Sequence, residues 1–281
     1  MLWGVLVFAF TTSCTKEGVY TPSKKIRKVY HSTSSIDKYL SQSWEWNGKL
    51  LEYINYYSSD GSLSWTENFT YDGKRLIQVD NYLGSEYITY EYDGKKLKSA
   101  NYFFSNSLGA TIAYTYSDNK LEKMIITYYD YYMKHNGNLL KTILPLPSEV
   151  TETINKALDK VCADRQEKEV YTFTYQFTWS DTNVSKIEAT EDGRIITANL
   201  QYDAKNNPFK GFHDLNSDVE SNPILCLSKN NVTRMILVYS DGDSEVQTYT
   251  YSYNSDNYPT MSIMRYADDD DYQSVYYYDY D

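Results

Sequence analysis

The chain has 281 residues, with 27 basic and 38 acidic side chains, and its formal net charge at pH 7 is −11. This acidic balance argues against nucleic-acid binding, because phosphates require a basic surface. Twelve glycines and six prolines are too few for a collagen-like or low-complexity chain. The 32 tyrosines argue against disorder, because so many rings can bury enough surface to offset the entropy of ordering.

The N-terminus predicts an exported lipoprotein. Leu2 to Phe10 is an apolar run that suits a secretory signal and is far shorter than the roughly 20 residues needed to cross a bilayer. Three small polar residues then lead into Cys14, as in a bacterial lipobox. We therefore predict a signal peptide over 1–13, lipidation at Cys14 and a lipid-anchored tether over 14–23, which makes the membrane a partner. The alternative is an ordinary signal peptide with an incidental cysteine.

Residues 24–281 predict a single all-β domain. Residues 171–179, 195–202 and 248–253 alternate with period two, so one face carries rings or aliphatic groups and the other carries mainly polar groups. Seven glycines follow Asn or Asp, a strong signal for tight hairpin turns. These pairs are Asn47-Gly48, Asp60-Gly61, Asp72-Gly73, Asp93-Gly94, Asn136-Gly137, Asp192-Gly193 and Asp241-Gly242.

A repeat organises these hairpins. The unit Tyr71-Asp72-Gly73-Lys74-Arg75-Leu76 recurs in related form before and after this position, at intervals of 21 to 25 residues. Each interval fits two strands and two turns. About sixteen strand candidates follow, which predicts an antiparallel up-and-down meander curling into a barrel or half-barrel.

Two segments interrupt the strand pattern. Apolar residues at helical spacing predict one amphipathic helix within 148–166, and prolines with many Asn and Asp predict a long loop over 204–231. These interruptions contain Cys162 and Cys226. An oxidising compartment would allow a disulfide between them, and the alternative is two separately buried thiols.

The tyrosines are the candidate ligand-binding residues. A ring with a hydroxyl suits sugars and other amphiphilic ligands, although the same rings also pack across strands. Where tyrosines occur in runs, alternation leaves some rings outside the core. The candidates are Tyr128, Tyr129, Tyr131, Tyr132, Tyr276, Tyr277 and Tyr278.

Sequence motifs for catalysis are absent. The three histidines, His31, His135 and His213, lack a second ligand at metal spacing and fit surface or loop positions. Carboxylates are abundant, so an acid–base pair of the glycosidase kind stays open. The run Asp268 to Asp271 fits a hairpin tip or a calcium site. We predict no cofactor, no metal and no enzymatic activity.

The turn repeats, with Cys14, Asn207-Pro208-Phe209 and Tyr258-Pro259-Thr260, resemble a family of Bacteroidetes lipoproteins of unknown function that is described as porin-like. The units are also similar to YD repeats. The resemblance implies a sheet wrapped into a barrel or half-barrel and transfers no catalytic residues. Charges within the strand candidates argue against a membrane pore, since a lipid-facing wall must be apolar.

These observations lead to three functional hypotheses. The first is a non-enzymatic outer-membrane lipoprotein that binds or scaffolds a glycan, peptide or lipid, on either the periplasmic or the outer side. The second is a structural or assembly partner in an envelope complex. The third is a carboxylate-based hydrolase.

Overall fold

A computed structural model describes residues 17–81, 84–129, 170–191, 193–212, 226–267 and 272–281. Sixteen strands occur in these ranges, in agreement with the predicted number. They are β1 (Ile26–Thr33), β2 (Tyr39–Asn47), β3 (Leu50–Tyr57), β4 (Leu63–Asp72), β5 (Arg75–Asn81), β6 (Glu86–Asp93), β7 (Lys96–Phe104), β8 (Ser107–Ser117), β9 (Lys120–Tyr128), β10 (Tyr171–Ser180), β11 (Asn183–Glu191), β12 (Arg194–Tyr202), β13 (Val232–Val238), β14 (Ser244–Tyr253), β15 (Pro259–Tyr266) and β16 (Gln273–Tyr280).

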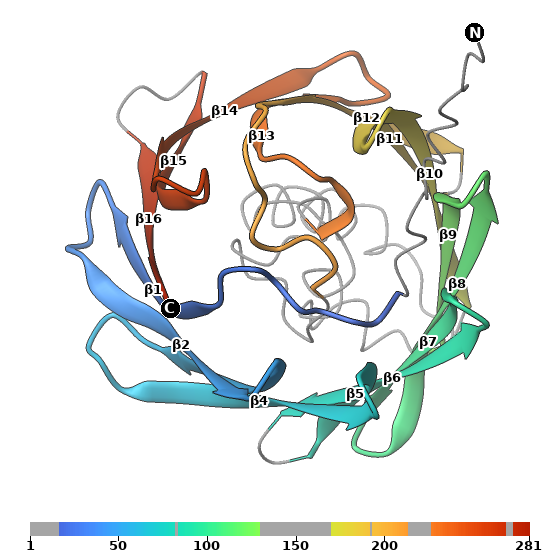
Figure 1. Cartoon of the computed structure of the whole chain (residues 1–281). Coiled ribbons are helices and arrows are strands. Elements are labelled where there is room, and N and C mark those ends of the chain that lie inside the picture. Colours follow the sequence, from blue (N-terminus) through green and yellow to red (C-terminus); the bar gives the residue numbers. More distant parts are fainter. Residues whose placement is uncertain (1–16, 82–83, 130–169, 192, 213–225, 268–271) are drawn as a thin grey trace, which may run out of the picture.

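The strands form a closed antiparallel barrel (Figure 1). Each strand pairs with its neighbours in sequence, and the ring closes where β1 pairs with β16, for example His31 with Tyr276. The predicted all-β meander is confirmed, and of its two forms the structure adopts the full barrel. Closure leaves neither end of the sheet with an unpaired strand.

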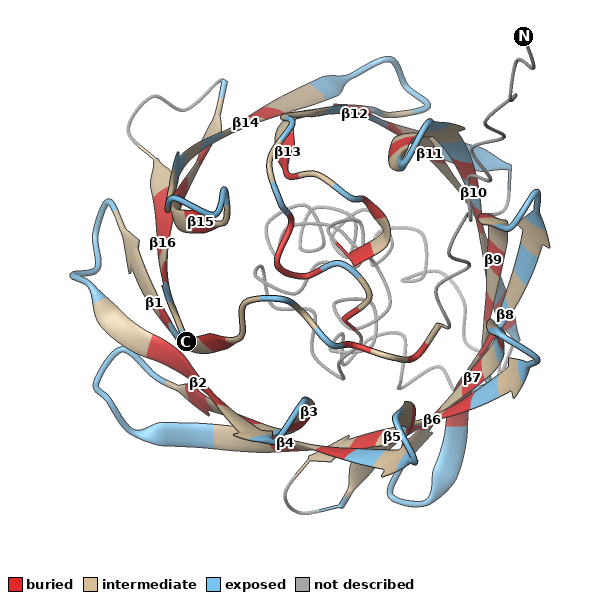
Figure 2. Cartoon of the chain, viewed as in Figure 1, coloured by how far each residue is buried: buried red, intermediate tan, exposed pale blue. Residues whose placement is uncertain are grey.

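The alternation in sequence sorts side chains between the two faces of the wall. Along β10 the rings of Tyr171, Phe173, Tyr175 and Phe177 are buried on the inner face, while the threonines and glutamine between them face outward. Figure 2 shows buried and intermediate residues around the ring and exposed residues gathered at the hairpin tips. The core is therefore the inside of the barrel, as the aromatic alternation predicts.

The two ends of the barrel differ in their connections. We call one the turn end: it holds the start of β1, the end of β16 and two-residue turns such as 48–49, 73–74 and 94–95. The opposite loop end holds the connections 34–38, 58–62 and 129–170 among others. Asp118 and Asn119 both have positive φ, as a type I′ turn requires.

Two predicted interruptions fall partly or wholly outside the described residues. The helix predicted within 148–166 lies outside them. Of the loop predicted over 204–231, residues 204–212 and 226–231 are described, and they lie inside the ring (Figure 1). Within the described ranges, no helix has the length and apolar character to cross a membrane.

Candidate binding surface on the inner wall

The repeated aromatic residue has a structural role at the turn end. In six of the hairpins, an inward ring near the end of an even-numbered strand donates a hydrogen bond to a carbonyl near the start of the strand before it, at 2.6 to 2.8 Å. We call these the turn-end bonds. They run from Trp46 to Ile26, Tyr92 to Leu76, Trp179 to Leu121, Tyr202 to Val184, Tyr251 to Val232 and Tyr280 to Pro259.

Basic residues at the starts of β5, β7 and β9, and Lys25 just before β1, reinforce four of the hairpins. Lys96 donates to the carbonyl of Asn119 at 2.6 Å, and its ammonium lies 4.6 Å from the ring centre of Tyr116. Lys25, Arg75 and Lys120 make the same pair of contacts in their hairpins. Both contacts are charge-assisted and hold neighbouring strands together. Within the Tyr-Asp-Gly-Lys-x-Leu pattern, the ring at the first position and the basic residue at position x therefore hold the strands together at the turn end.

The N-terminal segment also fastens the turn end from inside. Glu17 accepts hydrogen bonds from the Leu97 amide at 2.7 Å and the Tyr116 hydroxyl at 2.6 Å, and its own amide donates to Lys95. Gly18 follows with φ of +72°, and a Cβ there would lie 2.0 Å from the Tyr92 hydroxyl oxygen. Only glycine fits this close approach. Glu17 and Gly18, which lie in the segment predicted to be a tether, are thus held against the wall.

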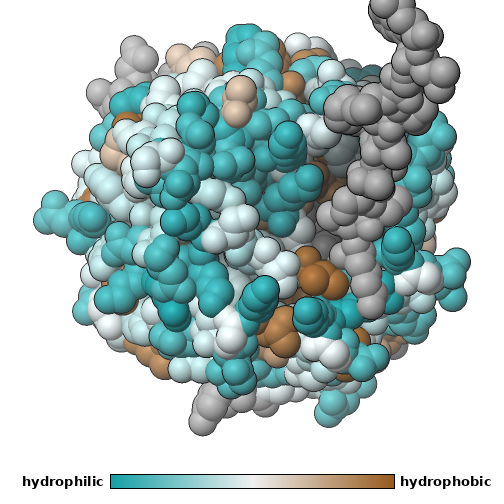
Figure 3. Space-filling view, in the orientation of Figure 1, coloured by the Kyte–Doolittle hydropathy of each residue, from teal (hydrophilic) through white to brown (hydrophobic). Residues whose placement is uncertain are grey.

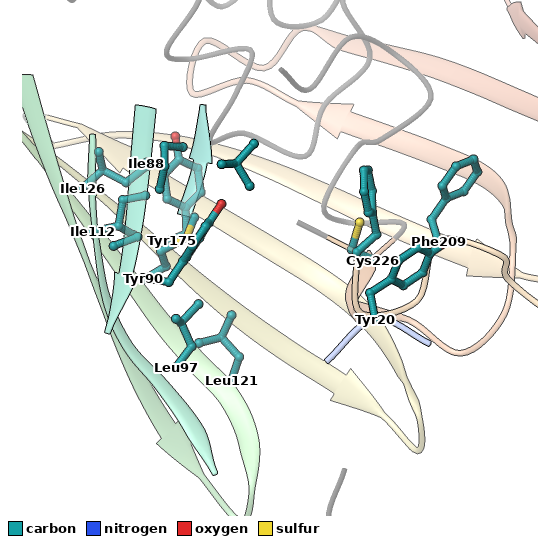
Figure 4. Packing of buried hydrophobic residues seen from close by; sticks show 14 of the residues in the cluster. Tyr20, Ile88, Tyr90, Leu97, Ile112, Leu121, Ile126, Tyr175, Phe209 and Cys226 are labelled. Atoms are coloured by element: carbon teal, nitrogen blue, oxygen red, sulfur yellow. The ribbon is translucent and has the colours of Figure 1, made fainter. Parts of the chain in front are cut away.

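Tyr20 joins this segment to the loop inside the ring. Its hydroxyl donates to the Pro208 carbonyl at 2.8 Å, and its ring packs 5.2 Å from Phe212, which in turn packs 4.9 Å from Trp44 of the wall. Figure 4 shows Tyr20, Phe209 and Cys226 together, apart from the side chains of the facing wall. Residues 17–25, 203–212 and 226–231 therefore form a plug inside the turn end.

Asp203 fixes the base of this plug. Its carboxylate accepts hydrogen bonds from the amides of Lys205 and Asn231, from the Asn231 side chain at 3.1 Å and from the Tyr253 hydroxyl. Four donors on one carboxylate hold the loop where it leaves β12 and returns to β13.

The inner wall changes character towards the loop end. At the turn end the wall begins with aliphatic residues such as Ile26, Leu51 and Val184. In the loop-end half, polar groups are buried among the rings. Glu67 is 0% exposed and accepts the Tyr56 hydroxyl at 3.0 Å, and Gln247, also 0% exposed, accepts the Tyr249 hydroxyl at 2.8 Å.

His31 lies in this polar part of the inner wall. Its Nδ1 is 3.2 Å from the Tyr39 hydroxyl and its Nε2 is 2.8 Å from the hydroxyl of Ser274, which is 1% exposed. Its ring stacks on Tyr276, with centroids 4.4 Å apart and planes 5° from parallel. The sequence predicts a surface or loop position for His31, and this prediction is wrong, because the side chain lies on the inner face of β1. Rings with hydrogen-bonding edges are what an amphiphilic ligand requires.

Burial also sets the charge state of the inward tyrosines. It raises the pKa of Tyr202 to about 12, and it raises the pKa of Tyr251 well above its ordinary value. These phenols are therefore neutral at physiological pH and can donate as well as accept hydrogen bonds.

The predicted tyrosines divide between the two faces of the wall. Tyr128, Tyr276 and Tyr278 are buried on the inner face. Tyr129 is exposed at the loop end, and Tyr277 lies on the outer face, where the Lys38 ammonium sits 4.1 Å from its ring centre. Tyr131 and Tyr132 lie outside the described residues.

Other predicted sites are only partly described. Cys226 is buried in the plug, while Cys14 and Cys162 lie outside the described residues, so the lipidation and the disulfide remain predictions. The Asp268 to Asp271 run, with its alternative of a calcium site, lies outside them too. Within the described ranges, no group of three His, Cys, Asp or Glu side chains could hold a metal ion.

Sequence reasoning missed the buried polar side chains of the inner wall. Gln42, Glu67 and Gln247 are ordinary polar residues within strands, and most such residues face water. The sequence does contain a signal, because side chains two residues apart in a strand point to the same face. Gln42 is two residues from Trp44, and Glu67 is two residues from Phe69. A period-two pattern with a polar residue on the aromatic face predicts a buried polar group.

Comparison with solved structures shows that this chain shares its fold with other proteins. The chain forms a closed antiparallel barrel of the kind seen in porin-like proteins. It is similar to solved structures of a porin-like protein from Bacteroides vulgatus ATCC 8482, with TM-score 0.51, 11% identity and coverage of 91% of this chain and 98% of that one. A second, from Bacteroides uniformis ATCC 8492, has TM-score 0.52, 12% identity and coverage of 95% and 99%. No known family profile and no curated protein matches the sequence.

Proposed function

We propose that this chain is a non-enzymatic, lipid-anchored envelope protein whose barrel binds an amphiphilic ligand, such as a glycan, peptide or lipid, on the inner wall of its loop-end half. The observation that carries this proposal is the mixture of rings and fully buried polar groups there, including Glu67, Gln247 and Ser274. Purely structural packing needs the rings but not the polar groups, which are costly to bury. The plug occupies the turn end, so a ligand would enter from the loop end.

The test is a glycan array and a lipid overlay on the mature chain, residues 15–281, followed by titration of any ligand found. Tyr276 and Tyr277 are a matched pair, adjacent in sequence and on opposite faces of β16. Tyr276→Ala is expected to weaken binding at least several-fold, and Tyr277→Ala to leave it unchanged. If Tyr277→Ala alone abolished binding, the result would show that the ligand binds the outer face of the barrel.

The alternative is a structural or assembly partner in an envelope complex, and the exposed apolar residues favour it. Of the nine large hydrophobic residues that are exposed in the described part of the chain, all but Ile77 lie at the loop end. They are Ile36, Leu63, Phe104, Leu108, Tyr129, Val170, Ile195 and Val238. We call this set the apolar rim. Such sites often mark protein contacts.

Co-purification from detergent-solubilised envelopes tests this alternative. A partner retained by the native chain and lost in Leu63→Ser/Val238→Ser would support it, with the turn-end Ile77→Ser as the matched control. A chain that runs as a lone monomer would count against it. For a hydrolase, Glu67 is the one carboxylate that the described residues bury, whereas the glycosidase mechanism uses two.

A further inference from the structure

The plug determines where the predicted lipid anchor can lie. Glu17 is tied by its amide and its carboxylate to Lys95, Leu97 and Tyr116, all at the turn end. The next residue is tied as well, because the Leu76 amide donates to the Gly18 carbonyl at 2.8 Å. The chain is therefore fixed to the turn end from Glu17 onward.

Only two residues separate Cys14 from Glu17. Three peptide steps reach at most about 11 Å. The strands contain seven to eleven residues, and at about 3.3 Å a residue they are roughly 23 to 36 Å long, which is about 16 Å or more along the axis at the usual tilt of about 35–45°. Cys14 therefore cannot reach the loop end along any path, and lipid on its sulfur would lie beside the turn end.

The distribution of charge points the same way. Of the twenty Lys and Arg residues in the described ranges, all but Lys38, Arg194 and Arg265 lie in the turn-end half of the barrel. Three of them, Lys49, Lys74 and Lys95, are exposed at the tips of turns. Figure 3, in the same view down the barrel axis, is mostly hydrophilic in colour.

Among the described residues, carboxylates are present at both ends, and basic groups slightly outnumber acidic ones at the turn end. The described part of the loop-end half is strongly acidic, with Asp37, Asp60, Asp80, Glu86, Glu188, Asp241, Asp243 and Glu245. Lipid phosphates would repel this end, while they would attract the tip lysines.

We propose that the turn end rests on the lipid headgroups of the membrane and that the loop end, with its apolar rim and ligand-binding inner wall, faces away from it. This inference rests on the proposed lipid anchor. The barrel would then have a fixed orientation on the membrane, because the two residues between Cys14 and Glu17 are too few to let it turn over. The ligand or partner then approaches from the side opposite the membrane.

Lysine acetylation read by mass spectrometry tests the orientation. The full chain, expressed in a bacterium that lipidates exported cysteines, is reconstituted into phosphatidylcholine vesicles containing phosphatidylglycerol and compared with the chain in detergent. Acetylation of Lys49, Lys74 and Lys95 is expected to slow several-fold on the vesicles. Lys38, exposed at the loop end, is the internal control and should be unchanged.

Flotation of the vesicles separates the two proposals. A chain that does not float would overturn the anchor and the orientation together, whereas a floating chain with Lys38 protected would overturn the orientation alone. A variant with a 20-residue Gly-Ser linker between Thr15 and Lys16 should still float but lose the protection of the tip lysines. Unchanged protection in that variant would show that the short connection does not set the orientation.

Discussion

Single side-chain hydrogen bonds join neighbouring strands at the turn end, and one that a tyrosine hydroxyl donates can be removed without changing the shape of the side chain. Tyr251→Phe deletes the bond to the Val232 carbonyl and leaves the ring in place. The expected loss in the free energy of unfolding is about 0.5–1.5 kcal/mol, the usual net value of one hydrogen bond. Urea denaturation measures it. Tyr277→Phe, on the outer face, is the control and should have little effect. Equal effects of the two substitutions would contradict the role of the turn-end bond.

Gly18 is the second residue whose identity the structure makes decisive. Gly18→Ala places a methyl group against the Tyr92 hydroxyl in a backbone conformation that disfavours side chains. We expect a loss of about 1–3 kcal/mol in unfolding free energy. Gly48→Ala is the matched control, because Gly48 also has positive φ but has open space around it. If both variants lose the same stability, the close approach to Tyr92 contributes nothing.

The orientation and contacts of individual side chains can be predicted from the sequence only in part. The alternation predicts that Tyr171 to Phe177 face inward, because each strand keeps its phase from end to end. It does not predict that the Trp46 indole bonds to the Ile26 carbonyl, because that bond joins two strands whose pairing is known only after the chain has folded. The inward histidine was missed for a similar reason. The type of a polar residue does not show whether it faces water or the inside of the barrel. Only the alternation of the residues around it in the strand shows this.

The plug consists mainly of turns and irregular backbone, and Asp203 fixes its base. Asp203→Ala removes the acceptor of four donors, one of them the Tyr253 hydroxyl. The expected cost is about 1.5–3 kcal/mol or more, since hydrogen bonds to charged groups are the stronger kind. Faster limited proteolysis within the loop should accompany the lower unfolding free energy.

Asp256→Ala is the control for this prediction. Asp256 pairs with Lys24 at 2.9 Å on the surface, where screening makes ion pairs weak, so its loss should change stability little. A stability loss in Asp256→Ala as large as that in Asp203→Ala would show that general charge, rather than the anchoring of the plug, determines stability.

The hairpins could be predicted as elements, whereas the plug could not. Asp-Gly and Asn-Gly turns mark the hairpins locally, within four residues. The plug depends on contacts between positions far apart, such as Tyr20 with Pro208, and no local pattern encodes them. Polar residues and proline in both segments fit a loop on the surface equally well, and only the aromatic residues Tyr20, Phe209 and Phe212 hint at burial.

The barrel as a whole is expected to be sensitive to alkaline pH. Burial raises the pKa of Tyr202 from about 10 to about 12, so the unfolded chain loses this proton first as the pH rises. The stabilisation is fully present below pH 10 and is lost as the pH rises through 12. Other inward tyrosines, including Tyr251, shift in the same direction and add to the effect.

Urea midpoints at pH 8 and pH 11 measure this loss, and tyrosinate absorbance at equilibrium should rise together with unfolding. Tyr202→Phe removes one titrating group and should reduce the difference between the two midpoints. Equal midpoints for the parent chain at both pH values would contradict the buried, neutral state of the inward phenols.

Closure of the ring by its two outermost strands has a consequence for folding. β1 finds its second partner only in β16, and the last residue, Asp281, donates its amide to the Lys25 carbonyl. β1 must therefore keep one open edge until β16 has folded against it. Any shortened product lacking β16 would expose two unpaired edges at once, which is a route to aggregation.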